Sequence, residues 1–395
     1  MADGLGGRPD AEGAHGSGRL ATADGLRREA GTRTGAGTGT GAAIELRPGI
    51  PDLGSFPRTV WATALRRALA TAPNSAFDYP EPAGLPVLRE AVAGYVARTR
   101  GVRADAEAVV ITAGFTAGLA LLGRVLRRRG ARMVAAEDPG LVRHREVLRA
   151  AGLTVAPLAV GPHGAEPDGA TGQAVLLTPA HQHPTGVVLA PQQRYRFIDW
   201  ARRNGAYLIE DDYDGEFRYD QRPVGAMQAL APERVVYAGS TSKSLAPGVR
   251  LGWMIVPAPL RRDLAAVIFE AGAAAVSVLD QLAMADLIVR GDYDRHVRRQ
   301  RLAYRRRRSQ LAAAINEPLR GVAAGMHALL PLESAADERR LVDEARQRGL
   351  VLTGLHHNGY WHEPAGKAAA LILGYAAPPA HLWPEALKLL AQLVQ

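Results

Sequence analysis

Short apolar runs alternate with helical segments through the middle of this chain, and this alternation constrains the fold more than any other feature. The runs, each bounded by glycine, proline or charged residues, cover residues 108–111, 133–135, 174–177, 206–209, 235–237 and 253–256. Segments with helical periodicity lie between them, for example at 119–129 and 191–203. Alternating strands and helices predict an α/β fold with a mostly parallel sheet covered by helices on both faces.

The pattern changes at both ends of the chain. Residues 1–43 contain no Val, Ile, Phe, Tyr or Trp. Such a segment cannot bury enough apolar surface to offset its ordering entropy, so it is predicted to be a disordered leader. Residues 44–290 are predicted to form a large domain with an N-terminal arm. Residues 291–395 are predicted to form a smaller α+β domain that begins with a long Arg-rich helix and ends with an amphipathic one.

Composition excludes several classes of protein. The chain has no cysteine, which rules out disulfides, thiolate nucleophiles and cysteine metal sites. It has neither a membrane-length apolar stretch nor a secretory signal, so no membrane contact and a cytoplasmic location are expected. The net charge is +9, and almost all of the positively charged side chains are arginine. The Arg-rich run at 295–308 is interpreted as the solvated face of a helix, with a polyanion contact as the lesser alternative, so nucleic acid is not an expected partner.

Ligands of open parallel sheets bind beyond the carboxyl ends of the strands, so the residues after each apolar run are the candidates for chemistry. Lys243 follows the run at 235–237, among small and hydroxyl residues. A lysine in a site that lowers its pKa suits Schiff-base formation. Ser240, Ser242 and Arg250 offer two hydroxyls and a guanidinium to a phosphate. A surface lysine is the alternative, but the chain's other two lysines lie in an unremarkable loop and helix.

Acidic residues follow the run at 206–209, in the sequence Glu210-Asp211-Asp212-Tyr213-Asp214. Consecutive acids at the end of a buried strand are costly unless they are used or solvated. One of these carboxylates is expected to pair with the protonated pyridine nitrogen of pyridoxal 5'-phosphate (PLP), which keeps the ring an electron sink. A solvated acidic turn is the alternative. A metal site is disfavoured, and none is predicted, because no compact histidine pair at ligand spacing accompanies the acids.

Two further strand ends carry weaker signals. Gly114, Phe115 and Thr116 open a helix after the first run, where backbone N–H groups form a ready phosphate site, although such turns are common. A polar loop at 178–186, which contains His183, follows the run at 174–177. Taken alone, this loop is interpreted as a plain turn with satisfied histidines.

Together these segments resemble the fold-type I PLP-dependent aminotransferases, and more closely the aminotransferase-like domain of the MocR/GabR regulators. The matching motifs are collinear over residues 44–395 and lie at 47–52, Tyr79 with 84–85, 181–186, 210–217, 240–243 with 250–252, and 295–299 with Tyr304 and Arg307. Each motif is weak alone, but six in order are specific. The resemblance implies the fold of that superfamily, with a large PLP-binding domain, a small C-terminal domain and PLP as the cofactor.

The resemblance also implies roles for single residues. Lys243 would hold PLP as a Schiff base and later shuttle a proton, Asp211 would bind the pyridine nitrogen, and Tyr213 and His183 would contact the ring hydroxyl. Tyr79 would reach the phosphate from a second subunit, because this fold places its sites at a homodimer interface. The rest of the phosphate cup would comprise Gly114, Phe115, Thr116, Ser240, Ser242 and Arg250.

The sequence departs from the family pattern at three places. Leu141 follows the Glu-Asp-Pro-Gly turn, where the family usually has an aromatic residue that stacks on the pyridine ring. Ile372 stands where aminotransferases often have an arginine for the substrate carboxylate, which counts against a standard α-amino-acid substrate. The winged-helix domain of the regulators is expected to be missing from this chain.

Two functions follow from the resemblance. The favoured one is a PLP-dependent aminotransferase that acts on an amino acid or amine through a Lys243 Schiff base. The alternative is the effector-sensing domain of a MocR/GabR-type transcriptional regulator whose DNA-binding domain is not in this chain. A catalytically inactive relative is least favoured, because Lys243, Asp211 and Arg250 would have no reason to persist together.

Overall fold

The structure is a computed structural model that describes residues 43–219, 224–271, 276–315 and 319–394. The leader predicted at 1–43 lies outside the described residues except for Ala43. The main sheet has eight strands in the order β2-β9-β8-β7-β6-β3-β4-β5. They are β2 (Val109–Thr112), β3 (Met133–Asp138), β4 (Thr154–Gly161), β5 (Gly164–Ala165), β6 (Ala174–Leu177), β7 (Tyr207–Asp211), β8 (Val235–Ser240) and β9 (Gly252–Ile255).

This sheet confirms the predicted α/β class. Strands β3, β4, β6, β7 and β8 run parallel to their neighbours in the series, whereas β9 is antiparallel to β8 and β2, and β5 is antiparallel to β4. Two antiparallel steps leave β2 running in the same direction as β8. The carboxyl ends of β2, β3, β6, β7 and β8 therefore meet at one edge of the sheet.

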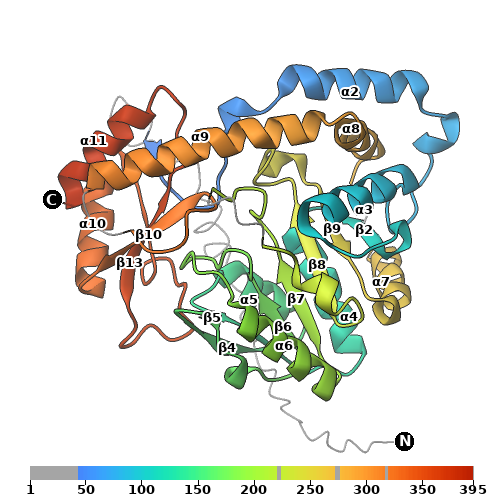
Figure 1. The fold of residues 1–395 in the computed structure, drawn as a ribbon, viewed down its shortest axis with the longest axis horizontal. Coiled ribbons are helices and arrows are strands. Elements are labelled where there is room, and N and C mark those ends of the chain that lie inside the picture. Colours follow the sequence, from blue (N-terminus) through green and yellow to red (C-terminus); the bar gives the residue numbers. More distant parts are fainter. Residues whose placement is uncertain (1–42, 220–223, 272–275, 316–318, 395) are drawn as a thin grey trace, which may run out of the picture. The chain divides into compact units, whose positions relative to one another are not determined.

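Helices cover both faces of the main sheet (Figure 1). Side chains alternate between the faces: Val175 and Leu177 pack in the core that contains α6, and Leu176 packs in the core that contains α4 and α7. The helices are α2 (Arg58–Thr71), α3 (Pro86–Arg100), α4 (Phe115–Arg128), α5 (Val142–Ala150), α6 (Pro191–Asn204), α7 (Ala258–Glu270) and α8 (Val278–Val289).

The C-terminal region forms a second, antiparallel sheet in the order β10-β13-β12, built from β10 (His327–Leu332), β12 (Thr353–Gly354) and β13 (Ala369–Gly374). Its helices are α9 (Asp292–Ile315), α10 (Ala335–Gln347) and α11 (Trp383–Val394). In Figure 1, α9 runs from α8 to α11 and so links the two regions. None of the helices in the described ranges is long and apolar enough to cross a membrane.

The first strand of the described chain joins the C-terminal region. Strand β1 (Ile44–Glu45) pairs in parallel with β11 (Leu350–Val351), and Ile44 packs in the same core as α10 and α11. The proposed boundary between residues 290 and 291 stays a prediction.

Strand β13 has two buried faces. Leu371 and Leu373 pack in the C-terminal core, whereas Ile372 points to the opposite face. There Ile372 packs with Tyr360 and Leu141, and Leu141 belongs to the turn after β3. The small sheet thus turns one of its faces toward the carboxyl edge of the main sheet.

Candidate functional site

Lys243 lies just beyond the end of β8, where its ammonium nitrogen Nζ donates a hydrogen bond of 2.6 Å to the carbonyl of Gly49. Burial lowers the pKa of Lys243, and the nearby carboxylates of Asp211 and Asp214 oppose the shift. Gly49 has a φ of 72°, and a Cβ there would lie 3.0 Å from Nζ. A glycine at this position therefore suits both the backbone turn and the close approach of the amine.

The residues predicted to receive a phosphate lie together. Ser240 and Ser242 have their hydroxyl oxygens 2.8 Å apart. Gly114 precedes α4, and a Cβ built on it would lie 3.8 Å from Nη1 of Arg250 and 3.9 Å from Oγ of Ser242. The first turn of α4, which begins at Phe115 and Thr116, thus starts next to the Ser242 hydroxyl and the Arg250 guanidinium, and the N–H groups of a helix start are suited to bind a phosphate.

Arg250 has an unusual backbone conformation. Its φ of 53° is the only positive value for a non-glycine residue within the described ranges. A left-handed conformation is costly for a residue with a Cβ and is typical of functional sites. This turn places the Arg250 guanidinium next to Gly114.

The three consecutive acids at the carboxyl end of β7, Glu210 to Asp212, have different environments. Glu210 accepts hydrogen bonds from two backbone N–H groups of the 3-10 helix Met227–Leu230. Asp212 binds the Arg100 guanidinium at 2.6 and 3.0 Å and accepts from the Tyr237 hydroxyl at 2.7 Å. Asp211 is equally buried, but its Oδ1 has no hydrogen-bond partner among the described residues.

Asp211 therefore has an unused acceptor in a buried position. Burial raises its pKa well above the usual range, and the charge of Lys243 opposes that shift. An unsatisfied buried carboxylate oxygen is costly unless a donor meets it. A protonated pyridine nitrogen is such a donor, so the residues present fit PLP.

Tyr213 and His183 also face this region. The Tyr213 hydroxyl lies 3.1 Å from Nδ1 of His181, and Nε2 of His183 lies 3.4 Å from the Tyr360 hydroxyl. The rings of Tyr213 and His183 are 5.7 Å apart in an edge-on arrangement. Burial raises the pKa of Tyr213 and lowers that of His183, so both side chains stay neutral at physiological pH.

Tyr79 does not join the cluster. Its side chain is 98% exposed and makes no side-chain hydrogen bond that the structure records. Its predicted role belongs to a second subunit, so that role stays a prediction.

Sequence reasoning did not assign Glu137 and His144 to the site. The Glu137 carboxylate accepts from the backbone and hydroxyl of Thr178, and burial raises its pKa to about 7. Burial lowers the pKa of His144 to about 3. Both line a cavity together with Leu141 and His183. The Glu-Asp-Pro-Gly turn was a usable signal for Glu137, whereas His144 lies in an ordinary helix.

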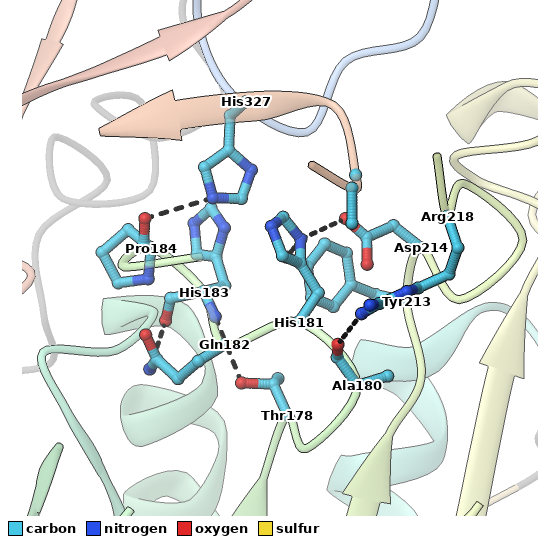
Figure 2. A network of polar contacts seen from close by, with 12 residues as sticks. Thr178, Ala180, His181, Gln182, His183, Pro184, Tyr213, Asp214, Arg218 and His327 are labelled. Atoms are coloured by element: carbon cyan, nitrogen blue, oxygen red, sulfur yellow. Dashed lines mark hydrogen bonds and ion pairs between the residues drawn. The ribbon is translucent and has the colours of Figure 1, made fainter. Parts of the chain in front are cut away.

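A histidine pair that sequence spacing did not reveal also lies here. His181, Asp214 and His327 are buried and offer possible ligand atoms within 4.8 Å of one another (Figure 2). His327 comes from β10 of the small sheet, far from His181 in sequence. This contact depends on how the small sheet packs, so the spacing of histidines along the sequence gives no sign of it.

Comparison with known proteins connects this geometry to a family. Residues 43–358 match the model of the family described as aminotransferase class I and II. The probable rhizopine catabolism regulatory protein MocR of Rhizobium meliloti is 32% identical over 343 residues, which cover 84% of this chain and 69% of that protein. The HTH-type pyridoxine biosynthesis transcriptional regulator PdxR of Corynebacterium glutamicum is 33% identical over 324 residues, 80% of this chain and 69% of that protein.

Solved structures show the same fold. An archaeal alanine:glyoxylate aminotransferase superposes with a TM-score of 0.81 at 23% identity, covering 94% of this chain and 93% of that one. Aspartate aminotransferase from Thermus thermophilus with maleate has a TM-score of 0.76 at 22% identity, covering 94% of each chain. The predicted likeness to fold-type I aminotransferases and to MocR-type regulators is confirmed.

Proposed function

We propose that this chain, which belongs to the aminotransferase class I and II family, binds PLP through Lys243 and acts as an aminotransferase on an amino acid or amine. The observation that carries the proposal is the unsatisfied Oδ1 of Asp211, which is buried near a lysine whose pKa burial lowers. The pyridine nitrogen of PLP requires a carboxylate that has no other partner. Its aldehyde requires an amine with a lowered pKa.

The other predicted contacts support the same placement. Ser240, Ser242, Arg250 and the first turn of α4 would hold the phosphate, through hydroxyl, guanidinium and backbone donors. Tyr213 and His183 would lie beside the ring hydroxyl. The phosphate end and the ring end of the cofactor would then rest on the carboxyl ends of β2, β7 and β8, where open sheets bind ligands.

When bound, PLP supplies an electron sink for the bonds at the α-carbon of an amine. The chain's residues would do the rest. The lowered pKa of Lys243 leaves Nζ neutral for part of the time, so that it can attack a carbonyl or take and return a proton. Asp211 would hold the pyridine nitrogen in its protonated form, because a buried carboxylate favours a cation beside it.

A homodimer is part of the proposal. The exposed Tyr79 ring would meet the phosphate of a second copy, and Phe77, 55% exposed on the same segment, would be covered with it. Aromatic side chains are enriched at protein interfaces. Mixing Tyr79→Phe and Lys243→Ala subunits tests this: shared sites predict that half of the hybrid's sites regain both groups and tight PLP binding.

A second function has a specific observation in its favour. The sequence relatives named above are transcriptional regulators, and Ile372 is fully buried where an arginine would bind a substrate carboxylate. On this alternative the chain senses an amino acid or amine, binding it at Lys243 without completing a transamination.

One spectroscopic experiment tests the proposal and separates the two functions. The PLP-loaded protein should show a visible band that is lost in Lys243→Ala and kept in the control Lys367→Ala, whose ammonium lies over the Trp361 ring. Conversion of the band by an amino acid or amine, and its return with a keto acid, would support transamination. A band that shifts with an amine and then stops would support sensing. No lysine-dependent band in the wild type would refute both.

A further inference from the structure

A buried hydrogen-bonded chain lies behind the predicted contact to the cofactor's ring hydroxyl. Nδ1 of His181 is 2.8 Å from Oδ2 of Asp214 and 3.1 Å from the Tyr213 hydroxyl. The side chains of His181 and Asp214 are 2% and 1% exposed. Figure 2 shows the His181 imidazole beside the Asp214 carboxylate and the Tyr213 ring, and lower in the view than His327.

The chemistry of these groups fixes where the protons lie. An ionised carboxylate only accepts hydrogen bonds, so the contact with Asp214 requires the proton of His181 on Nδ1. The same N–H then also points at the oxygen of Tyr213. That oxygen acts as an acceptor toward the imidazole. The hydroxyl's own proton has the Asp214 carboxylate as a hydrogen-bond partner here, and a cofactor oxygen would compete for the same proton. Nε2 of His181 has no partner within the described residues, in keeping with a lone pair there.

Tyr213 stays protonated in this setting. Burial raises the pKa of its hydroxyl well above 10, and the carboxylates of Asp214 and Asp211 add to the shift. A tyrosine that cannot ionise acts toward a cofactor oxygen as a hydrogen-bond donor.

Gly325 of the C-terminal region packs closely against His181 and Asp214. A Cβ on Gly325 would lie 2.2 Å from Cε1 of His181 and 2.4 Å from Oδ2 of Asp214, so no larger residue fits without a shift. The carbonyl of Gly325 accepts from the hydroxyls of Tyr219 and Tyr375. The backbone at Gly325 therefore leaves little room for the His181 imidazole and the Asp214 carboxylate to move.

We propose that Asp214 and His181 form a positioning dyad that orients the Tyr213 hydroxyl as a donor to the cofactor's ring oxygen. The proposal rests on the proposed binding of PLP at Lys243. The dyad does not touch the reacting atoms; it acts through Tyr213. Its expected effect is on the protonation of the bound cofactor, because a donor to the ring oxygen stabilises negative charge there.

The test is a pH titration of the visible band of the PLP-loaded protein, arranged as a double-mutant cycle. Tyr213→Phe should raise the midpoint by about one to two pH units, the size expected for loss of a hydrogen bond to a charged group. His181→Leu should raise it in the same direction. In the Tyr213→Phe background, His181→Leu should add no further shift, because its effect passes through the hydroxyl.

Two further variants address the fold and the mechanism. His181→Asn keeps an N–H donor near the position of Nδ1 and should restore most of the wild-type midpoint. Asp214→Asn keeps the shape of the carboxylate but also removes a charge that raises the pKa of Lys243. Its effect is therefore compared with and without Tyr213→Phe, because only the part that passes through the hydroxyl should disappear in the double variant. His327→Leu is the control for packing. It removes a ring that is as buried as His181 and lies 5.0 Å from the His181 ring and 4.8 Å from the His183 ring, while the Nδ1 donor to Tyr213 stays in place.

The outcomes separate the dyad from the binding of PLP. A lysine-dependent band whose midpoint is unchanged in His181→Leu, or is shifted equally by Asp214→Asn with and without Tyr213→Phe, would overturn the dyad and leave the proposed function standing. So would a His181→Leu shift that persists undiminished with Tyr213→Phe. A midpoint that changes with a chelator would assign His181, Asp214 and His327 to a cation instead. A wild type without any such band would overturn both proposals.

Discussion

The main sheet and the small sheet present different chemistry to the candidate site. The carboxyl edge of the main sheet supplies a lysine, an unpaired carboxylate and the hydroxyls of Ser240 and Ser242. The facing side of the small sheet supplies Leu329, Ile372 and the neutral ring of His327, whose pKa burial lowers.

The difference separates two tasks. The groups proposed to bind a phosphate and a pyridine ring lie at the carboxyl edge of the main sheet, whereas the small sheet offers an apolar wall. Arg145 does not compensate for Ile372, since its guanidinium donates to the backbone carbonyls of Gly140, Gly359 and Tyr360. We therefore expect ligands without a carboxylate near Ile372, such as a primary amine, to convert the visible band at lower concentrations than the corresponding α-amino acid.

The largest effect is a loss of stability expected at Asp212. This residue is paired with an arginine, whereas the adjacent Asp211 is proposed to bind PLP. Asp212→Ala leaves the buried Arg100 guanidinium without its carboxylate. Removal of one partner from a buried ion pair lowers the free energy of unfolding by about 3–5 kcal/mol. Urea unfolding should show this loss of stability, whereas PLP affinity of the folded protein should change little. An equal loss of PLP affinity in Asp212→Ala and Asp211→Asn would contradict the division of tasks.

The two faces of β13 give the next comparison. Ile372 and Leu373 are both fully buried, so truncation of either to alanine should cost about 2–5 kcal/mol. Only Ile372→Ala changes the face toward Leu141 and Tyr360. Ile372→Ala should change the amine concentration at which half of the visible band is converted. The matched control Leu373→Ala should leave that concentration unchanged, because Leu373 packs in the C-terminal core. Equal effects on that concentration would show that the apolar wall does not contact the ligand.

Glu137 allows a pH test on the main-sheet side. Its folded-state pKa of about 7 exceeds the ordinary 4.5, so its contribution to stability is present below pH 4.5 and lost as pH rises through 7. The shift corresponds to about 3 kcal/mol. Glu137→Gln should therefore gain stability relative to the wild type between pH 4.5 and 8, measured by thermal unfolding. A constant difference across that range would mean that Glu137 ionises normally.

Much of the main-sheet side was readable from the sequence, for a physical reason. Asp211 is the last residue of the buried strand β7, Lys243 lies three residues after the end of β8, and parallel strands bring their carboxyl ends to one edge. The contact between His181 and His327 was not readable, because it depends on how the small sheet packs. The same limit applies to Asp212, whose partner Arg100 lies far away in sequence. Periodicity predicts elements, but not which elements meet.

Asp211→Asn tests the unpaired carboxylate directly. Loss of a charged hydrogen bond to the pyridine nitrogen costs about 1.5–3 kcal/mol, or roughly tenfold to 150-fold in PLP affinity. Because burial raises the pKa of Asp211, its contribution to the stability of the cofactor-free protein is lost as pH rises, and Asp211→Asn should remove that loss. A variant that binds PLP as tightly as the wild type in a fluorescence titration would argue against this partner for the ring.

The smallest effect is expected at Leu141, where the two regions meet. Leu141 lines the cavity beside His183 and also packs against the apolar wall of Ile372. Leu141→Tyr would supply the ring that the family usually places over the pyridine, and aromatic pairs contribute about 0.5–1.5 kcal/mol beyond area burial. PLP affinity should rise roughly twofold to tenfold. Because the larger ring must also fit against Ile372, the same variant in an Ile372→Val background should gain more. If the gain is the same in both backgrounds, the small sheet does not restrict the space above the ring, and selectivity must come from elsewhere on the main-sheet edge.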